Sequence, residues 1–100
     1  MPILHVESII TPSGAIMKPI TDEELMQQAQ KGDPNAFSIV ADRYREALLS
    51  YLSWGLGSIR NVEAIHDQVL IRARRSIINY RFPQKFATWL FTFAYRAIKR

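Results

Sequence analysis

FATWLFTFAYRAIKR, residues 86–100, is the stretch around which the rest of the chain is arranged. Apolar residues at three- and four-residue spacing share one side of a helix, so we expect a core-facing stripe made of Phe86, Leu90, Phe93 and Ala97. A second set repeats every fourth residue on the other side: Phe91, Tyr95 and Lys99. Trp89, Arg96 and Arg100 share one flank of the stripe. A helix that needs one apolar face therefore has two, and it is either buried all round or offers its second face to a ligand.

The positive charge of the chain is concentrated towards its C-terminal end. Residues 68–100 contain eight basic residues and no acidic ones: Arg72, Arg74, Arg75, Arg81, Lys85, Arg96, Lys99 and Arg100. Residues 1–67 contain five basic and nine acidic residues. Cations attract phosphate, and aromatic rings set among them are what unpaired bases stack on. The C-terminal third is therefore predicted to bind nucleic acid, while a solvated face remains the alternative for any single arginine.

Length and composition favour one folded domain. One hundred residues, 48% of them hydrophobic, suffice for a single modest core. The chain has no cysteine, which excludes disulfides and thiolate sites and favours a reducing compartment, so we expect a cytoplasmic protein. The sequence shows neither an apolar run long enough to span a membrane nor the pattern of a secretory signal, and we expect no membrane partner.

The first twenty residues differ in character from the rest. Residues 1–20 contain three prolines, a Ser-Gly pair and a short β-prone run, Ile9-Ile10-Thr11. This composition predicts a mobile or loosely docked N-terminal arm. Residues 21–100 are predicted to form the helical domain.

Two helices are expected in the first half of that domain. The first begins at a capping box, Thr21-x-x-Glu24, and ends at Gly32. The second follows Asp33-Pro34, which supplies an N-cap acid and a proline at the first helical position. Its apolar pattern predicts an unbroken helix to about Ser53.

Two further helices complete the prediction. Glycines at positions 55 and 57 end the second helix, and Asn61 is the expected N-cap of the third. Pro83 ends or interrupts the third helix, and a short basic loop leads into residues 86–100. The predicted fold is all-α, a compact bundle of about four helices.

Three segments in this order and spacing carry a family resemblance: AQKGDPNAF (29–37), RYREALLSYL (43–52) and FATWLFTFAYR (86–96). Together they resemble conserved region 2 of the extracytoplasmic-function (ECF) sigma factors of bacterial RNA polymerase, over about residues 22–100. The resemblance implies a helical module that docks on the clamp helices of the largest polymerase subunit and recognises and melts the promoter −10 element. Its implied partners are the RNA polymerase core and the single-stranded non-template strand of promoter DNA.

The resemblance implies two sets of site residues. Those expected to contact polymerase lie in the third helix: Glu63, His66, Asp67, Gln68 and Ile71. Those expected to contact DNA lie in the loop from Asn79 to Lys85 and in the last helix: Asn79, Arg81, Phe82, Gln84, Lys85, Trp89, Tyr95, Arg96, Lys99 and Arg100. Stacking rings and cations without nearby acids suit the capture of a flipped base and a displaced strand. For Trp89 a core position is the alternative.

The chain departs from the family pattern at several positions. Of the acids usual in the polymerase-facing helix only Glu63 is in place, with Asp67 as partial compensation, so docking is expected to be weaker or differently directed. Arg74 stands where an aromatic is common, and Arg96 stands where an asparagine usually receives the flipped base. The alternative function is a degenerate sigma-like regulatory module that binds a partner sigma or anti-sigma protein without reading DNA.

The chain stops within the helix that should be the last of region 2, before any helix-turn-helix that reads a −35 element. Two expectations follow from the resemblance. The chain is either a fragment of a longer sigma factor or a stand-alone region 2 protein. In the second case a separate polypeptide carrying region 4 is the expected partner, and an anti-sigma factor is a further one.

Other kinds of site have little support in the sequence. Glu63-x-x-His66 has the spacing of a helical metal pair, but a bundle site needs that motif twice with further carboxylates. We expect no metal and no cofactor, and we expect His66 to be exposed or at an interface. Glycine-rich phosphate loops, nucleophile elbows and paired carboxylates in an apolar setting do not occur, so an enzyme is not expected.

Overall fold

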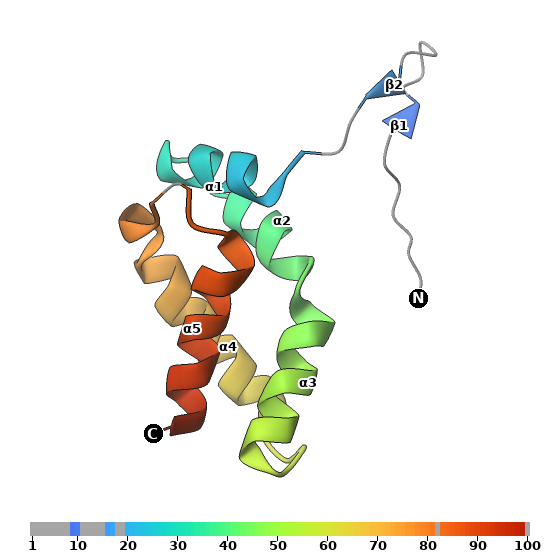
Figure 1. Ribbon diagram of the computed structural model, residues 1–100, viewed down its shortest axis with the longest axis vertical. Coiled ribbons are helices and arrows are strands. Elements are labelled where there is room, and N and C mark those ends of the chain that lie inside the picture. Colours follow the sequence, from blue (N-terminus) through green and yellow to red (C-terminus); the bar gives the residue numbers. More distant parts are fainter. Residues whose placement is uncertain (1–8, 11–15, 18–19, 82, 100) are drawn as a thin grey trace.

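The computed structural model describes residues 9–10, 16–17, 20–81 and 83–99. Strands β1 (Ile9–Ile10) and β2 (Ile16–Met17) pair antiparallel, with Ile9 opposite Met17. They lie apart from the helices in Figure 1. Most of the predicted arm, residues 1–20, falls outside the described residues, as do two expected DNA contacts, Phe82 and Arg100.

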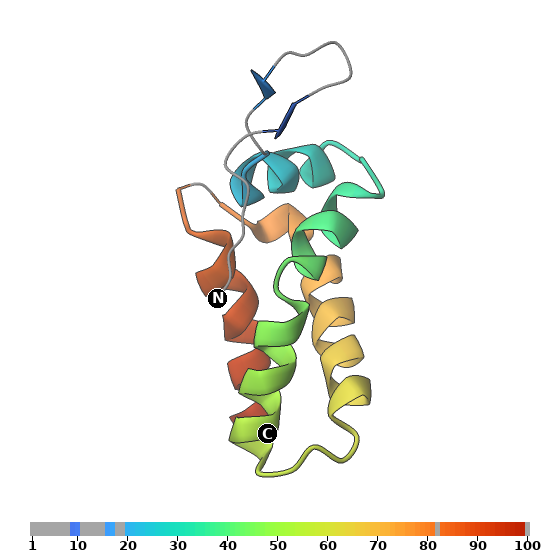
Figure 2. The ribbon, with the colours of Figure 1, turned by 90° about the vertical axis from the view of Figure 1, so that its right-hand side faces the viewer.

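The rest of the described chain forms five α-helices and one short 3-10 helix. They are α1 (Asp22–Gln30), α2 (Ala36–Asp42), α3 (Arg45–Leu56), α4 (Val62–Arg75), η1 (Ile77–Asn79) and α5 (Phe86–Lys99). The three longest, α3, α4 and α5, run along the body of the molecule, and α1 lies across one end (Figures 1 and 2). The all-α prediction is confirmed. Within the described part of the chain, no helix is long and apolar enough to cross a membrane.

The predicted helix boundaries at α1 are confirmed by the contacts found there. The Glu24 N–H donates to Thr21 Oγ1 at 3.1 Å, and the Thr21 N–H donates to Glu24 Oε1 at 3.0 Å. These two bonds form the expected capping box. Gly32 follows the end of α1 with φ of +105°, a backbone conformation that favours glycine. Asn61 is the residue before α4, but its side chain makes no capping bond.

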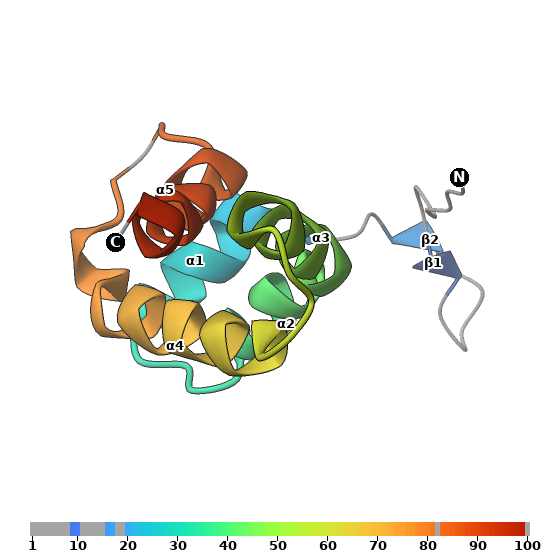
Figure 3. The same ribbon diagram turned by 90° about the horizontal axis from the view of Figure 1, so that it is seen from below.

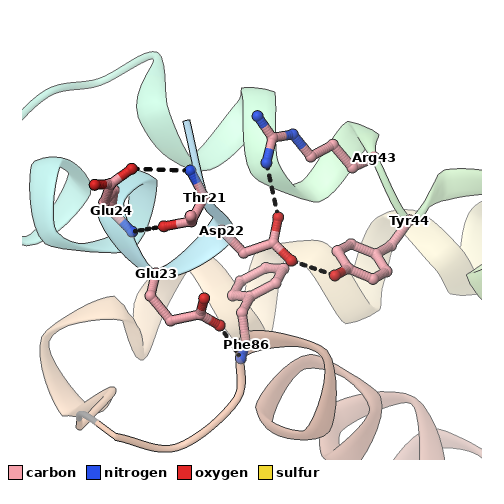
Figure 4. A network of polar contacts seen from close by, with 7 residues as sticks. All are labelled: Thr21, Asp22, Glu23, Glu24, Arg43, Tyr44 and Phe86. Atoms are coloured by element: carbon pink, nitrogen blue, oxygen red, sulfur yellow. Dashed lines mark hydrogen bonds and ion pairs between the residues drawn. The ribbon is translucent and has the colours of Figure 1, made fainter. Parts of the chain in front are cut away.

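The predicted second helix is divided into α2 and α3, which corrects the expectation of an unbroken helix. At the division, the Arg43 and Tyr44 N–H groups donate to carbonyls three residues back, on Val40 and Ala41, so the turn tightens. Both side chains also donate to Asp22 of α1, Arg43 at 2.9 Å (Figure 4). We attribute the break to this contact with α1, because no glycine or proline marks it.

Helix α5 packs against both α3 and α4, which also pack against each other, as Figure 3 shows from below. This position explains its two apolar faces. On one side Phe91 meets Tyr51 of α3 edge-on at 5.3 Å, and on the other Trp89 meets Tyr80 at 5.5 Å. Phe86 and Leu90 are fully buried as predicted. Phe91, which was expected to face away from the core, is instead partly buried against it.

Helix α3 passes close to α5 at Gly55. A Cβ at this position would lie 2.2 Å from Ile98 Cδ1 and 2.8 Å from its Cγ1, so a larger residue cannot be accommodated without movement. We expect Gly55→Ala to lower the free energy of unfolding by about 1–3 kcal/mol, the usual cost of overpacking. Urea unfolding followed by circular dichroism measures this change.

The control is the same substitution in an Ile98→Ala background, where the clashing atoms are gone. There alanine, the better helix former, should be neutral or stabilising by up to about 1 kcal/mol. An equal loss in both backgrounds would contradict the packing explanation.

Candidate nucleic-acid interface

The loop between α4 and α5 is held at both ends by α1. Gln30 donates from Nε2 to the carbonyl oxygens of Ile77 at 3.0 Å and Tyr80 at 2.6 Å. The Glu23 carboxylate accepts the backbone N–H of Phe86, the first residue of α5, at 3.0 Å (Figure 4). An acid at this point also complements the positive end of the helix dipole. The predicted DNA-contacting loop is therefore fixed to α1 at both of its ends, through Gln30 and Glu23.

Bonds within the loop organise its backbone further. Tyr80 is fully buried, and its hydroxyl donates to the Gln84 carbonyl. Burial raises the pKa of Tyr80, so the hydroxyl keeps its proton at neutral pH. The guanidinium of Arg81 donates to the Ile78 carbonyl at 2.7 Å. The side chains of Asn79, Arg81, Gln84 and Lys85 are exposed, so a fixed backbone presents four of the predicted contacts to solvent.

A groove runs from this loop along α4 and α5. Beside the loop is a pocket of about 280 Å³, lined by Ser76, Asn79, Gln84, Trp89, Thr92, Phe93 and Arg96. It adjoins a pocket of about 320 Å³, lined by Arg72, Arg75, Ser76, Phe93, Arg96 and Ala97. A third, of about 260 Å³, is lined by Gln68, Ile71, Arg72 and Arg75. Because the three share residues, we treat them as one surface, the α4–α5 groove, and none of the described residues lining it is acidic.

The two ends of the groove differ in chemistry. The end beside the loop carries the amides of Asn79 and Gln84, which both donate and accept hydrogen bonds, as the edge of a base requires. The other end carries guanidinium groups, which suit phosphate oxygens. Arg96 lines both ends, and its guanidinium lies 5.6 Å from the centroid of the Phe93 ring. The groove can therefore hold a base and its neighbouring phosphates together.

Trp89 belongs mainly to the core. It is 7% exposed, and the rings of Tyr80, Phe86 and Phe93 lie 5.5, 5.9 and 5.0 Å from it. These neighbours occupy the space that a stacking base would need. The expectation of an open stacking ring is corrected: Trp89 contributes a small part of one pocket wall.

Not all of the predicted DNA contacts lie together. Tyr95 is 53% exposed and lies near Lys99, whose Nζ is 6.0 Å from its ring, but neither residue lines the groove. Arg72 and Arg75 do line it, although the sequence did not distinguish them from a solvated face. The signal for them was the spacing of Gln68, Arg72 and Arg75 along one side of α4.

The residues predicted to contact polymerase are divided by the structure. Glu63, Asp67, Gln68 and Ile71 are exposed on α4. His66 is 1% exposed, which overturns the expectation of an exposed or interface residue, because α4 turns this position towards α2.

The structure also brings acids together around Arg45. This guanidinium donates to Glu63 at 2.7 Å. The hydrogen bond and charge of Glu63 raise the pKa of Arg45, and the charges of Asp67 and Asp42 add to the effect. Asp42 thus joins Glu63 and Asp67 on one face. It was missed because a continuous second helix gave no reason to pair it with α4.

Because Gln30 fixes two loop carbonyls, removing its amide should loosen the loop. We expect Gln30→Ala to cost about 1–2 kcal/mol of unfolding free energy and to speed amide hydrogen exchange in residues 76–85. Gln27→Ala, at an exposed position of the same helix, is the control and should change neither quantity. Unchanged exchange in Gln30→Ala would show that the loop is ordered without α1.

The comparisons with known sequences and with solved structures agree with each other. The chain matches no family model. It is 32% identical over 69 residues to the ECF RNA polymerase sigma factor SigW of Bacillus subtilis, covering 69% of this chain and 37% of that protein. It is 31% identical over 80 residues to the ECF RNA polymerase sigma-E factor of Escherichia coli K12, covering 80% and 41%. The chain thus spans about two fifths of these relatives' length. An NMR structure of an engineered region 2 of sigmaE in complex with GTAAAA is also similar, with TM-score 0.73 and 31% identity over 80% of this chain and 83% of that one.

Proposed function

This chain belongs to the ECF sigma factors through its region 2 domain, and on that premise we propose that it binds RNA polymerase core and recognises and melts the promoter −10 element. Family membership itself indicates a role in transcription initiation rather than in catalysis. The observation that carries the finer proposal is the acid-free α4–α5 groove, which joins an amide-lined pocket to a run of arginines. We further propose that residues 21–100 act as the domain and residues 1–20 as an arm.

In the proposed mechanism, one base of the displaced strand leaves the stack and enters the pocket beside the loop. Asn79 and Gln84 meet its edge, while Arg72, Arg75 and Arg96 hold the phosphates on either side. Unstacking a base costs a few kcal/mol, which these contacts offset. Support comes from the relative in complex with GTAAAA, which has this fold.

The preformed loop lowers the free-energy cost of capturing a base. Because Glu23 and Gln30 fix its ends and Tyr80 ties its middle, little ordering entropy is lost when a strand binds. A base is then captured by an existing pocket rather than by one that must form. The free energy of the contacts with the strand then stabilises the open DNA and is not used to order the loop.

The polymerase-facing surface in this proposal is the exposed side of α4, with Glu63 and Asp67, extended by Asp42 of α2. Carboxylates on this face would meet basic groups on the clamp helices. Since a region 2 module has no reader of a −35 element, we propose that promoter-specific initiation needs a region 4, in the same chain or in a second polypeptide.

A second candidate function is the sigma-like regulatory module that binds a partner sigma or anti-sigma protein without reading DNA. Arg74 favours this candidate, because it stands where the family usually has an aromatic residue. Its guanidinium lies 4.9 Å from the Phe37 ring centroid and donates to Ser38 Oγ at 3.0 Å. The surface at this position therefore differs from the one that family members usually present.

Co-purification with core RNA polymerase separates the two candidates. The proposed function predicts that core polymerase is retained, with or without an added region 4 polypeptide, and that single-stranded −10-like DNA binds more tightly than the same duplex. If no polymerase is retained even with region 4 present, the initiation-factor proposal fails. Retained polymerase without any preference for the single strand would refute the proposed recognition and melting of the −10 element.

A further inference from the structure

A small cavity lies between α2 and α4, away from the α4–α5 groove. Its volume is about 130 Å³, and it is lined by Phe37, Ser38, Ala41, Asp42, Arg45, His66, Leu70 and Arg74. One water needs only about 10–15 Å³ of such space, so the cavity can take a larger group. Nothing in the proposed DNA contacts uses it.

His66 gives this cavity an unexplained polar atom. The side chain is 1% exposed, and its Nε2 has no hydrogen-bond partner among the described residues. Nδ1 lies 3.3 Å from the Asp67 carboxylate, which can only accept, so we assign the imidazole N–H to Nδ1. Nε2 then presents a lone pair, and a buried acceptor without a donor costs free energy unless a ligand supplies one.

The other polar groups of the cavity determine what kind of ligand fits. The two guanidinium groups are already engaged: Arg45 donates to Glu63, and Arg74 donates to Ser38 and covers Phe37. Asp42, by contrast, makes no hydrogen bond or ion pair within the described ranges. Asp42 is exposed and its charge acts on Arg45, so the buried polar atom left without a partner is the acceptor His66 Nε2, and the Asp42 carboxylate lines the same cavity.

The charged groups around His66 also favour a ligand that donates hydrogen bonds. Asp67 and Arg74 face it from α4, Asp42 from α2, and Arg45 from α3. With Glu63, three carboxylates act on Arg45, so around this guanidinium the acids outnumber the single positive charge. A ligand with hydrogen-bond donors and positive charge would donate to His66 Nε2 and pair with the Asp42 carboxylate.

We propose that this cavity is a socket for the cationic end of an arginine or lysine side chain of a protein partner, held by His66 Nε2 and the Asp42 carboxylate. The apolar side of the cavity, with Ala41 and Leu70, receives the aliphatic stem, as such side chains require. The identity of the partner, RNA polymerase core, rests on the proposed function, whereas the chemistry of the socket does not. The socket extends the exposed acidic face of α4 into the body of the domain.

The first test observes His66 directly by NMR in the full chain. The chain has two histidines, so the imidazole nitrogens are readily assigned with a His5→Gln variant. The probes are N-methylguanidinium, methylammonium and acetate, added as salts at equal ionic strength and millimolar concentration. We expect a saturable shift of His66 Nε2 with a cation and none with acetate, and a weaker affinity, by about tenfold, in Asp42→Asn.

The two cations distinguish an arginine from a lysine as the occupant. Saturation by acetate instead would overturn the proposal in favour of an anion site at Arg74. No shift with any probe would also overturn it and leave the cavity to water alone.

The second test measures retention of core polymerase by the wild type, Asp42→Asn and Glu46→Gln. Glu46 is an exposed acid of α3 outside the cavity, so its variant is matched in charge. We expect affinity to fall about tenfold for Asp42→Asn and to stay unchanged for Glu46→Gln. Equal affinity of all three would overturn polymerase as the occupant and remove Asp42 from the polymerase-facing surface, while retention by the wild type keeps the rest of the proposed function. If wild type retains no polymerase but a cation saturates His66, the proposed function fails and the socket stands.

Discussion

Trp89→Ala is expected to lower the free energy of unfolding by about 3–5 kcal/mol, the usual cost of removing a large buried aromatic. Trp89 packs among Tyr80, Phe86 and Phe93, so its loss leaves a cavity where the loop meets α5. Domains of this size are stable by only about 5–15 kcal/mol, so the substitution removes a large fraction of the total stability. Urea unfolding followed by circular dichroism measures the change.

The chain supplies its own control, because its other tryptophan is at the surface. Trp54 is 80% exposed, so Trp54→Ala should change the unfolding free energy by less than about 0.5 kcal/mol. Each variant keeps one tryptophan, whose fluorescence can be measured separately. We expect the emission maximum of Trp89 in Trp54→Ala to be blue-shifted, and that of Trp54 in Trp89→Ala to resemble tryptophan in water. Equal stability of the two variants would contradict the burial of Trp89. Lost DNA binding in Trp89→Ala is informative only once folding has been shown.

Much of the fold followed from local signals in the sequence. The capping box at Thr21 and Glu24 involves residues three apart, so the sequence contains all of its parts. The same holds for Gly32, whose positive φ no other residue adopts as easily. The break at Arg43 and Tyr44 could not be predicted this way. It depends on Asp22, twenty-two positions before Tyr44, and nothing between them points to that contact.

For the candidate site, the sequence predicted the sign of the charge and the segment involved, but not which faces meet. The spacing of α5 shows that Phe91 and Tyr95 share a side. Whether that side is open depends on α3, which covers Phe91 through Tyr51 and leaves Tyr95 exposed. His66 likewise faces inward only because α2 packs there. Helix periodicity predicts relative faces, and only the packing of the whole chain decides which of them are buried.

The arginines of the α4–α5 groove lead to the second large prediction, which concerns DNA affinity. The double variant Arg72→Gln/Arg96→Gln should bind single-stranded −10-like DNA about tenfold to a hundredfold more weakly at low salt, because charge-assisted hydrogen bonds to phosphate are lost. Its salt dependence should also become shallower, by about 0.7 in the slope of log affinity against log salt for each phosphate contact removed. Fluorescence anisotropy at several salt concentrations measures both quantities.

The matched control is Lys31→Gln/Arg60→Gln, which removes the same charge from exposed positions outside the groove. Long-range attraction to DNA falls equally in the two double variants, since both lower the net charge by two. Only a local contact can make them differ in salt slope, because counterion release counts the phosphates that are neutralised. Equal affinities and slopes would show that the chain attracts DNA through its overall charge and that the groove does not hold the strand. A difference confined to the groove variant, with both proteins equally stable in urea, would place the phosphates between α4 and α5.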